Sequence, residues 1–250
     1  MSEKISEVDI LNFALNLEYL EAEFYTYATT GKSITSFGLG INGQASGSNP
    51  AGGGTTSGGA KVTFSNDESV LHDIATQIGA AERAHVVLLR GALGSAAVAM
   101  PNIDLAAFGF GFGNQNDFLR AARILEDIGV TAYAGAAGLL STPDIITTAA
   151  CLLGAEAEHA AAIRTHIARL KIATTSIDGV DLLPPPSGEP RQTLSVKVGD
   201  GLIATRTAGQ VLYLAFGGKA GAKQGGFFPT GLNGTIASSS EGAAVAKIAA

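Results

Sequence analysis

Glu82-Arg83-Ala84-His85 and Glu156-Ala157-Glu158-His159 are two copies of one signature, Glu-x-x-His, in this chain of 250 residues. Residues three apart lie on the same face of an α-helix, so each copy presents a carboxylate and an imidazole side by side. Two facing helices with this signature supply part of a dinuclear metal site, which takes one further Glu from each of two partner helices. The signature therefore predicts two more helices, each with an inward-facing Glu.

Glu18 and Glu126 fit that requirement. Each is followed seven residues later by a tyrosine, Tyr25 and Tyr133. Seven residues are two helical turns, so each Glu shares a helix face with its Tyr. The chain is thus interpreted as two helix pairs, each with Glu…Tyr first and Glu-x-x-His second. The tyrosines are expected either to donate hydrogen bonds to the site or to be redox-active, with core packing as the alternative.

The charge of these residues favours a pair of metal ions. Four carboxylates in an apolar bundle would be costly without cations, and two divalent ions neutralise them. Carboxylate oxygens with a few imidazole nitrogens suit iron or manganese. The alternative is that the two signatures are unrelated pairs on solvated helix faces.

Neighbouring ionisable residues are also candidates. Glu21 shares a face with Glu18, and Glu158 belongs to the second signature. Either is a candidate extra ligand, although solvated or interfacial roles are expected. His166 is expected at the surface, with a place at the end of the site as the alternative, and Asp127 is expected to be exposed.

Helical periodicity and capping residues predict four helices. They are expected at 6–29, from Ser65 to about Leu93, from Asp117 to about Leu140, and from Thr142 to near Lys171. The third and fourth helices are joined by about two residues, which forces them to be antiparallel neighbours. The connection at 95–116 is long enough to cross the bundle. The fold class is therefore an all-α four-helix bundle with a long crossover between its second and third helices.

Two segments depart from this pattern. Residues 31–64 are rich in Gly, Ser, Thr and Asn, with a strand pattern only at 61–64, and are expected either to pack on a neighbour or to be disordered. After the stiff run Pro184-Pro185-Pro186, alternation predicts strands at 193–198 and 211–216.

The chain is accordingly divided into two parts. Residues 1–175 are predicted to form the bundle. Residues 176–250 are predicted to form a Pro/Gly-rich extension with short β-strands, packed on the bundle or on a neighbouring subunit.

Composition excludes several classes of function. A net charge of -6 argues against a nucleic-acid partner. A single cysteine, Cys151, excludes an internal disulfide and an iron–sulfur cluster held by cysteines of this chain, and it is expected to be buried on a helix. No apolar run predicts a transmembrane segment. The start of the chain lacks the features of a signal peptide, so a cytoplasmic location is expected, or an exported one if Met1 is a processed start.

Residues 11–25, Leu-Asn-Phe-Ala-Leu-Asn-Leu-Glu-Tyr-Leu-Glu-Ala-Glu-Phe-Tyr, resemble the first helix of ferritin-like proteins related to plant desiccation-related protein. Residues 210–213 and 225–229 also resemble that family, so the resemblance covers nearly the whole chain. It implies a ferritin-like bundle whose six metal ligands are Glu18, Glu82, His85, Glu126, Glu156 and His159.

The sequence differs from bacterioferritin, rubrerythrin and cage-forming ferritins in three features. The predicted second helix has no Met, so the haem ligand of bacterioferritin is absent, and no Cys cluster supplies the rubredoxin module of rubrerythrin. The loop at 31–64 and the extension replace the parts with which a ferritin builds its cage, which argues against iron storage in a shell.

The sequence thus leads to two functional hypotheses. In the first, a di-iron or di-manganese centre reacts with oxygen or peroxide in stress protection, as an oxidoreductase of oxidase, peroxidase or catalase type. In the second, the bundle is a structural or desiccation-protective scaffold whose metal is structural or absent. A homo-oligomer assembled through the loop and the extension is expected in both cases.

Overall fold

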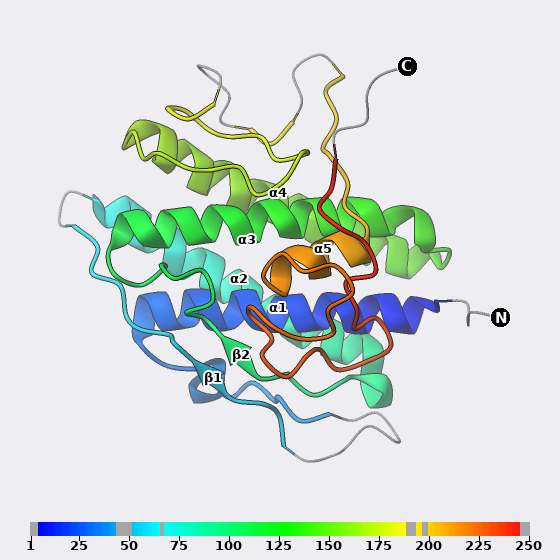
Figure 1. The fold of residues 1–250 in the computed structure, drawn as a ribbon. Helices are drawn as coiled ribbons and strands as arrows, with labels where there is room; N and C mark the ends of the chain where they lie inside the picture. Colours follow the sequence, from blue (N-terminus) through cyan, green and yellow to red (C-terminus); the bar gives the residue numbers. More distant parts are fainter. Residues whose placement is uncertain (1–4, 44–51, 66–67, 189–193, 197–199, 246–250) are drawn as a thin grey trace.

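Four long helices form a bundle in the computed structural model, which describes residues 5–43, 52–65, 68–188, 194–196 and 200–245. The helices are α1 (Glu7–Thr30), α2 (Ser69–Leu93), α3 (Gln115–Ala136) and α4 (Pro143–Arg169) (Figure 1). The predicted all-α bundle is confirmed. Short 3-10 turns follow α1, α2 and α3 at Ile34–Phe37, Gly94–Ala96 and Ala137–Leu139.

Capping residues account for the helix ends. Ser6 and Asp9 form a capping box at the start of α1, and Gly31 ends that helix with φ of 73°. Asn114 caps α3 by accepting hydrogen bonds from the backbone N–H groups that follow it, and Pro143 occupies the first turn of α4.

Two predicted boundaries were wrong. The second helix begins at Ser69 with Glu68 as its N-cap, four residues after the predicted start at Ser65. The third helix ends at Ala136 rather than near Leu140, because the chain tightens there into a 3-10 turn before the short link to α4.

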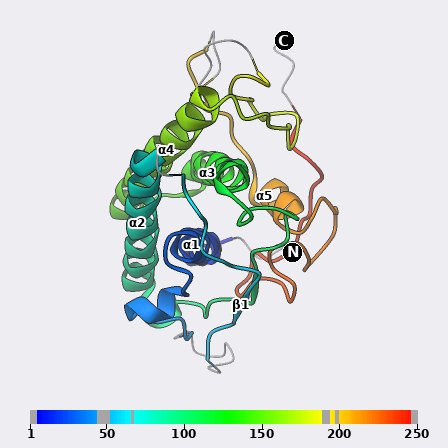
Figure 2. The same cartoon turned by 90° about the vertical axis from the view of Figure 1, so that its left-hand side faces the viewer.

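The helices are arranged in layers. Viewed end-on, α1 and α3 lie side by side, with α2 and α4 on one side of them and α5 (Ala208–Ala215) on the other (Figure 2). The segment between α2 and α3 runs along α1. At one end of α1 the Val98 N–H donates to Asn12 Oδ1 over 3.0 Å, and further along the Phe112 and Phe24 ring centroids lie 5.3 Å apart. The predicted crossover is therefore confirmed.

The described parts of the Gly-rich loop pack on the bundle. Strand β1 (Thr56–Ser57) pairs in parallel with β2 (Ile103–Asp104) of the crossover, whereas the pattern at 61–64 forms no strand. The Ser33 hydroxyl donates to the buried Glu23 of α1 over 2.7 Å. A Cβ at Gly54 would lie 2.4 Å from the Pro101 carbonyl oxygen, so the close approach of the two loops requires glycine there.

The predicted strand at 211–216 is wrong, because this run belongs to helix α5. An apolar run of this length is compatible with either structure. Thr207 and Gln210 form a capping box that starts the helix. Of the run at 193–198, Val196 makes an isolated antiparallel bridge with Ile203, and residues 193 and 197–198 lie outside the described residues.

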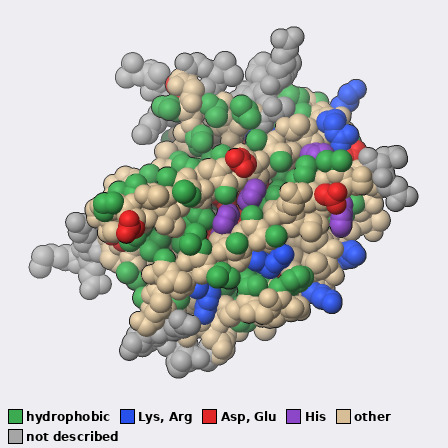
Figure 3. Space-filling model, turned by 180° about the vertical axis from the view of Figure 1, so that it is seen from behind, with side chains coloured by type: hydrophobic (Ala, Val, Ile, Leu, Met, Phe, Trp, Pro, Cys, Tyr) green, Lys and Arg blue, Asp and Glu red, His purple; other side chains and the backbone are tan. Residues whose placement is uncertain are grey.

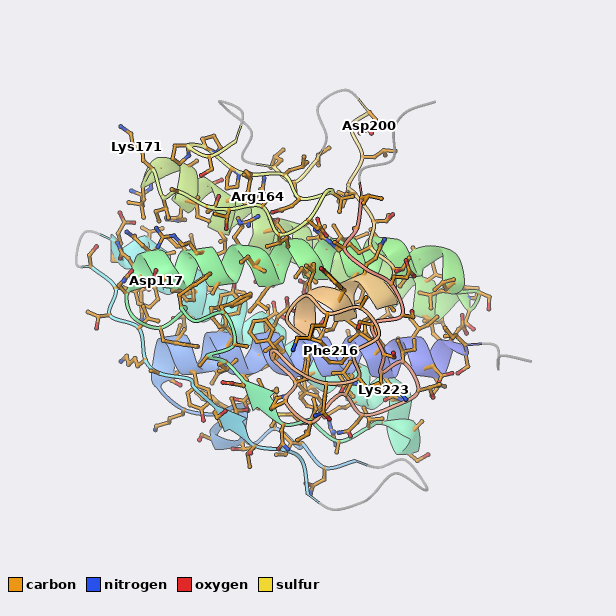
Figure 4. All side chains as sticks on the ribbon, viewed as in Figure 1. Asp117, Arg164, Lys171, Asp200, Phe216 and Lys223 are labelled. Atoms are coloured by element: carbon orange, nitrogen blue, oxygen red, sulfur yellow. The ribbon has the colours of Figure 1, made fainter. Side chains whose placement is uncertain are left out.

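The extension joins the core of the bundle. Phe216, at the end of α5, is 1% exposed and belongs to the same hydrophobic cluster as the residues of α1 and α3 (Figure 4). Beside this cluster, Arg206 donates two hydrogen bonds to Asp178, and its Nη1 donates to Thr131 of α3. Among the described helices, none has the length and hydropathy needed to cross a bilayer.

This packing predicts that the extension stabilises the bundle. Replacing Phe216 with Ala should lower the free energy of unfolding by about 3–5 kcal/mol, the usual cost of truncating a buried Phe. Chemical denaturation followed by circular dichroism measures the change. Leu202→Ala, at a side chain that is 67% exposed, serves as the control and should leave stability nearly unchanged. Equal stability of the two variants would contradict this packing.

Candidate metal centre

The six residues expected to bind metal meet in the middle of the bundle. They form two groups, in each of which one ligand atom per residue lies within 4.8 Å of the others. Glu18 and His85 belong to one group only, and Glu126 and His159 to the other. Glu82 and Glu156 belong to both. Each helix of the bundle contributes to the cluster, and the two shared carboxylates come from the two Glu-x-x-His signatures.

The shared position of Glu82 is visible in its distances to both histidines. Its Oε2 lies 3.2 Å from His85 Nδ1, and its Oε1 lies 2.8 Å from His159 Nδ1. His85 Nδ1 is also 3.2 Å from Glu18 Oε2, and His159 Nδ1 is 3.5 Å from Glu126 Oε2. Each imidazole therefore directs Nδ1 towards Glu82 and one carboxylate of its own group, and His85 Nδ1 also lies 3.6 Å from the shared Glu156.

Burial leaves many of these atoms without hydrogen-bond partners. Glu82, Glu126 and Glu156 are 0% exposed, and Glu18 is 1% exposed. Both oxygens of Glu126 and of Glu156 are sealed from solvent and unpartnered, as are Glu82 Oε1 and His159 Nδ1. These last two atoms lie close together but are not aligned as donor and acceptor. Sealed, unpartnered oxygens are costly in a protein, so the donor set fits metal ions that would bind them.

Burial and neighbouring charges shift the pKa values of the clustered residues. Burial raises the pKa of Glu18 to about 7 and the pKa of Glu156 well above its usual range, the latter with help from Glu21 and Glu82. Burial alone would also raise the pKa of Glu82, but the two histidines outweigh it and lower that pKa to about 2. Burial alone would lower the pKa of His85 and His159, but their carboxylate neighbours raise both values to about 10.

The two tyrosines reach the glutamates of the opposite helix. Tyr133 of α3 donates a hydrogen bond of 2.5 Å to Glu18 of α1. Tyr25 of α1 is fully buried, and burial followed by the charge of Glu126 on α3 raises its pKa. Two helical turns separate each Glu from the Tyr on its own helix, so only an antiparallel neighbour brings Tyr and Glu to one level. The sequence predicted the shared faces but not this exchange.

Several neighbours of the site are placed differently from expectation. Glu21 is 4% exposed and lies in the bundle beside Glu156, not in solvent. Asp127 is 4% exposed and paired with Arg123 and Arg164, and His166 is 8% exposed. The one signal for Glu21 was its helical spacing from Glu18. Asp127 had one local signal, Arg123 four residues earlier, whereas its other partner, Arg164, is 37 residues away. Glu158 is exposed, as expected.

Cys151 was also placed wrongly, since it is exposed on the outer face of α4. In the view from behind, histidine side chains are visible near the middle of the molecule, with acidic and basic side chains around them (Figure 3). The side chains of His85 and His159 are 11% and 12% exposed, and their ring centroids lie 6.0 Å apart. Of the six clustered residues, the two histidines therefore have the most solvent-exposed side chains.

A family model described as "Ferritin-like domain" matches residues 6–169, which is more than half of the chain. This chain belongs to the ferritin-like family. The matched segment begins at the N-cap of α1 and ends with α4, so it contains the whole four-helix bundle and all six residues of the cluster.

Two curated relatives are similar to this ferritin-like protein. Desiccation-related protein PCC13-62 of Craterostigma plantagineum is 29% identical over 176 residues, which cover 64% of this chain and 52% of that protein. The aligned part thus spans about half the length of that relative. Ferritin-like catalase Nec2 of Nesocodon mauritianus is 24% identical over 276 aligned positions, which cover 93% of this chain and 85% of that protein. The resemblance to the desiccation-related group is therefore confirmed, and the buried cluster is compatible with a dinuclear metal site.

Gly129 of α3 makes room for Glu156, because a Cβ at Gly129 would lie 2.4 Å from Glu156 Oε2. We predict that Gly129→Ala displaces this carboxylate and lowers the amount of manganese bound per chain, measured by elemental analysis after loading with Mn²⁺. Gly154→Ala on α4 is the matched control, since nothing lies within 4 Å of its Cβ position. Equal metal content in the two variants would show that Glu156 does not need this space.

Metal uptake is also expected to depend on pH. At neutral pH the histidines, with pKa values of about 10, are protonated, and the pKa of Glu156 is raised. Divalent ions must displace these protons, so the affinity for Mn²⁺ should rise from about pH 6 to about pH 9 with net proton release. Calorimetric titration in two buffers of different ionisation enthalpy measures the protons, and identical heats in both would refute this expectation.

Proposed function

We propose that this chain binds a dinuclear iron or manganese centre and reacts with oxygen or peroxide, as an oxidoreductase of oxidase, peroxidase or catalase type. The observation that carries the proposal is the pair of overlapping ligand groups, which share Glu82 and Glu156. Two overlapping groups of carboxylate and imidazole are the arrangement of ferritin-like di-iron and di-manganese proteins. The name of one relative, a ferritin-like catalase, favours peroxide as the substrate.

The six residues would divide the work of holding two ions. Glu82 and Glu156 would bridge them, since each is within reach of both groups. Glu18 and His85 would be the remaining ligands of one ion, and Glu126 and His159 would be the remaining ligands of the other. Bound iron or manganese would supply the redox chemistry, because the side chains of the site offer no two-electron couple of their own.

The remaining residues of the site would hold it in place and keep water out. Tyr133 fixes Oε1 of Glu18 through its hydrogen bond, so that Oε2, which faces His85 Nδ1, would be the oxygen offered to an ion. Tyr25 and the apolar residues of α1 and α3 exclude bulk water, which strengthens electrostatic interactions inside the bundle.

The proposal predicts about two metal ions per chain. It also predicts which substitutions reduce metal binding and the reaction with peroxide. Glu156→Gln should remove a bridging ligand, reduce the bound metal to one ion or fewer, and abolish disproportionation of peroxide. Glu158→Gln changes an exposed carboxylate two residues away and should leave both properties intact. Elemental analysis and an oxygen electrode with added hydrogen peroxide make the comparison. Protein that takes up neither iron nor manganese would refute the proposal.

The competing hypothesis is a protective scaffold, and the name of the desiccation-related relative supports it. It expects Glu156→Gln to protect a partner enzyme against drying as well as the unaltered chain does. Protection that is lost when residues 190–250 are deleted, but retained in Glu156→Gln, would favour the scaffold over the redox enzyme.

The homo-oligomer expected from the sequence also stays a proposal. Light scattering of the purified chain measures the mass of the assembly. A closed shell of many subunits would instead support metal storage.

A further inference from the structure

A narrow crevice lies between α1, α3 and the beginning of α4. Its volume is about 30 Å³, and a cavity of roughly 10–15 Å³ already holds one water molecule. Half-buried residues, among them Ala136, Leu140 and Ala149, form its outer part, whereas the buried Glu21 and Gly129 lie deeper. The crevice therefore leads from the surface into the bundle.

Small side chains on facing helices create this space. On α1, Ala14 lies on the crevice, and on α3 the wall consists of Gly129, Ala132 and Ala136. These positions recur at helical spacing, so they form one stripe along α3 that faces α1. Side chains of one carbon or none cannot fill the distance between two neighbouring helices, and a gap remains.

The inner end of the crevice meets the metal centre. Gly129 is the residue whose Cβ position is occupied by Glu156, and Tyr133, also on the wall, donates to Glu18. The carboxylate of Glu21 lies close to Glu156, since both approach the Cβ position of Gly129, at 3.2 Å and 2.4 Å. Three lining residues thus touch or adjoin the proposed ligands.

Glu21 is the one carboxylate at this end that the two ligand groups do not include. In the described part of the chain it forms no hydrogen bond or ion pair. Its oxygens are not among the sealed atoms, unlike those of Glu126 and Glu156, so a molecule in the crevice can touch them. Apart from Glu21 and Tyr133, the walls are apolar.

This lining selects for small uncharged molecules. Apolar walls offer no compensation for the lost hydration of an ion, and the narrow bore excludes larger organic compounds. A carboxylate at the inner end accepts a hydrogen bond from a molecule that carries O–H groups. A second cavity of about 30 Å³ shares Leu17, Glu21 and Gly129 with the crevice, but Val211 and Phe227 of the extension cover it.

We propose that the crevice between α1 and α3 is the path by which a small uncharged oxidant, hydrogen peroxide or dioxygen, reaches the metal centre. The oxidant would arrive beside Glu21. The path rests on the proposed function, since it assigns the entry route to the same site. The imidazole edges between α2 and α4 are the alternative route.

The test compares two neighbouring residues of α4. Ala149 lines the crevice, whereas Ala150 is exposed outside it. Ala149→Leu should fill the outer part of the crevice and Ala150→Leu should not. In the manganese- or iron-loaded protein, stopped-flow rates with peroxide and with oxygen should fall about tenfold in Ala149→Leu, because entry then waits for side chains to move. Rates in Ala150→Leu should equal those of the unaltered chain.

Xenon provides a readout that does not depend on activity, because it occupies apolar cavities. Crystals of the unaltered chain and of Ala150→Leu under xenon pressure should show a peak next to Ala14 and Ala132, which line the crevice but not the second cavity, and crystals of Ala149→Leu should not. Ala136→Leu, on the opposite wall, should repeat the result if Ala149→Leu folds poorly.

Two results would overturn the crevice as the path. One is the absence of xenon from it in the unaltered chain. The other is unchanged rates in both filled variants at equal metal content, which would assign entry to the α2–α4 side. If the protein takes up no metal, the proposed function fails, and the xenon peak by itself still decides whether the crevice admits a small uncharged molecule.

Discussion

The burial of like charges is the constraint on which the centre of this molecule depends. Four carboxylates, those of Glu18, Glu82, Glu126 and Glu156, lie within one cluster and are almost completely removed from water. Their ion-pair partners in the described part of the chain are two histidines. Burial raises the pKa values of Glu18, Glu126 and Glu156, and neighbouring carboxylates, which two imidazolium groups cannot neutralise, raise them further. Apolar packing of the helices fixes the cluster in place whether or not the charges are compensated.

A second set of buried charges is balanced within the protein itself. Arg164 and Arg123 both donate to Asp127, and Arg123 also reaches Asp181 of the extension. Arg164 lies between α4 and the segments that follow it (Figure 4). A buried ion pair of this kind is costly to break, because the remaining charge has no partner. Asp127 and Glu126 are adjacent in sequence but face different surroundings: Asp127 is paired with arginines, and Glu126 lies in the cluster of carboxylates and histidines.

Small residues leave space between the helices through which a small molecule can enter the bundle. Gly129 serves two purposes, since its missing side chain admits Glu156 on one side and leaves space in the crevice on the other. The extension closes the neighbouring cavity with Val211 and Phe227. Packing of the non-helical parts against α1 and α3 therefore contributes to the shape of the site, although these parts supply none of the six candidate ligands.

Local patterns were sufficient to predict the bundle and the six clustered residues. The Glu-x-x-His signature and the seven-residue Glu…Tyr spacing follow from helix geometry, which depends on neighbours within two turns. The caps at Ser6 with Asp9 and at Asn114 are also local interactions within the first turn of each helix. The strand prediction at 211–216 was wrong because the length and composition of this run suit a strand as well as a buried helix.

Tertiary structure alone decided the rest. The exchange of tyrosines between α1 and α3 requires the antiparallel order of two helices more than 80 residues apart in the chain, as the pair Tyr133 and Glu18 shows with a separation of 115. Spacing along one helix placed Glu21 on the face of Glu18 and Asp127 near Arg123, but the burial of both carboxylates depends on which distant helix or arginine lies opposite. The sequence by itself thus determined which residues share a helix face. Only the packing of distant segments determined which charges lack water, which of them have partners, and where a small molecule can enter.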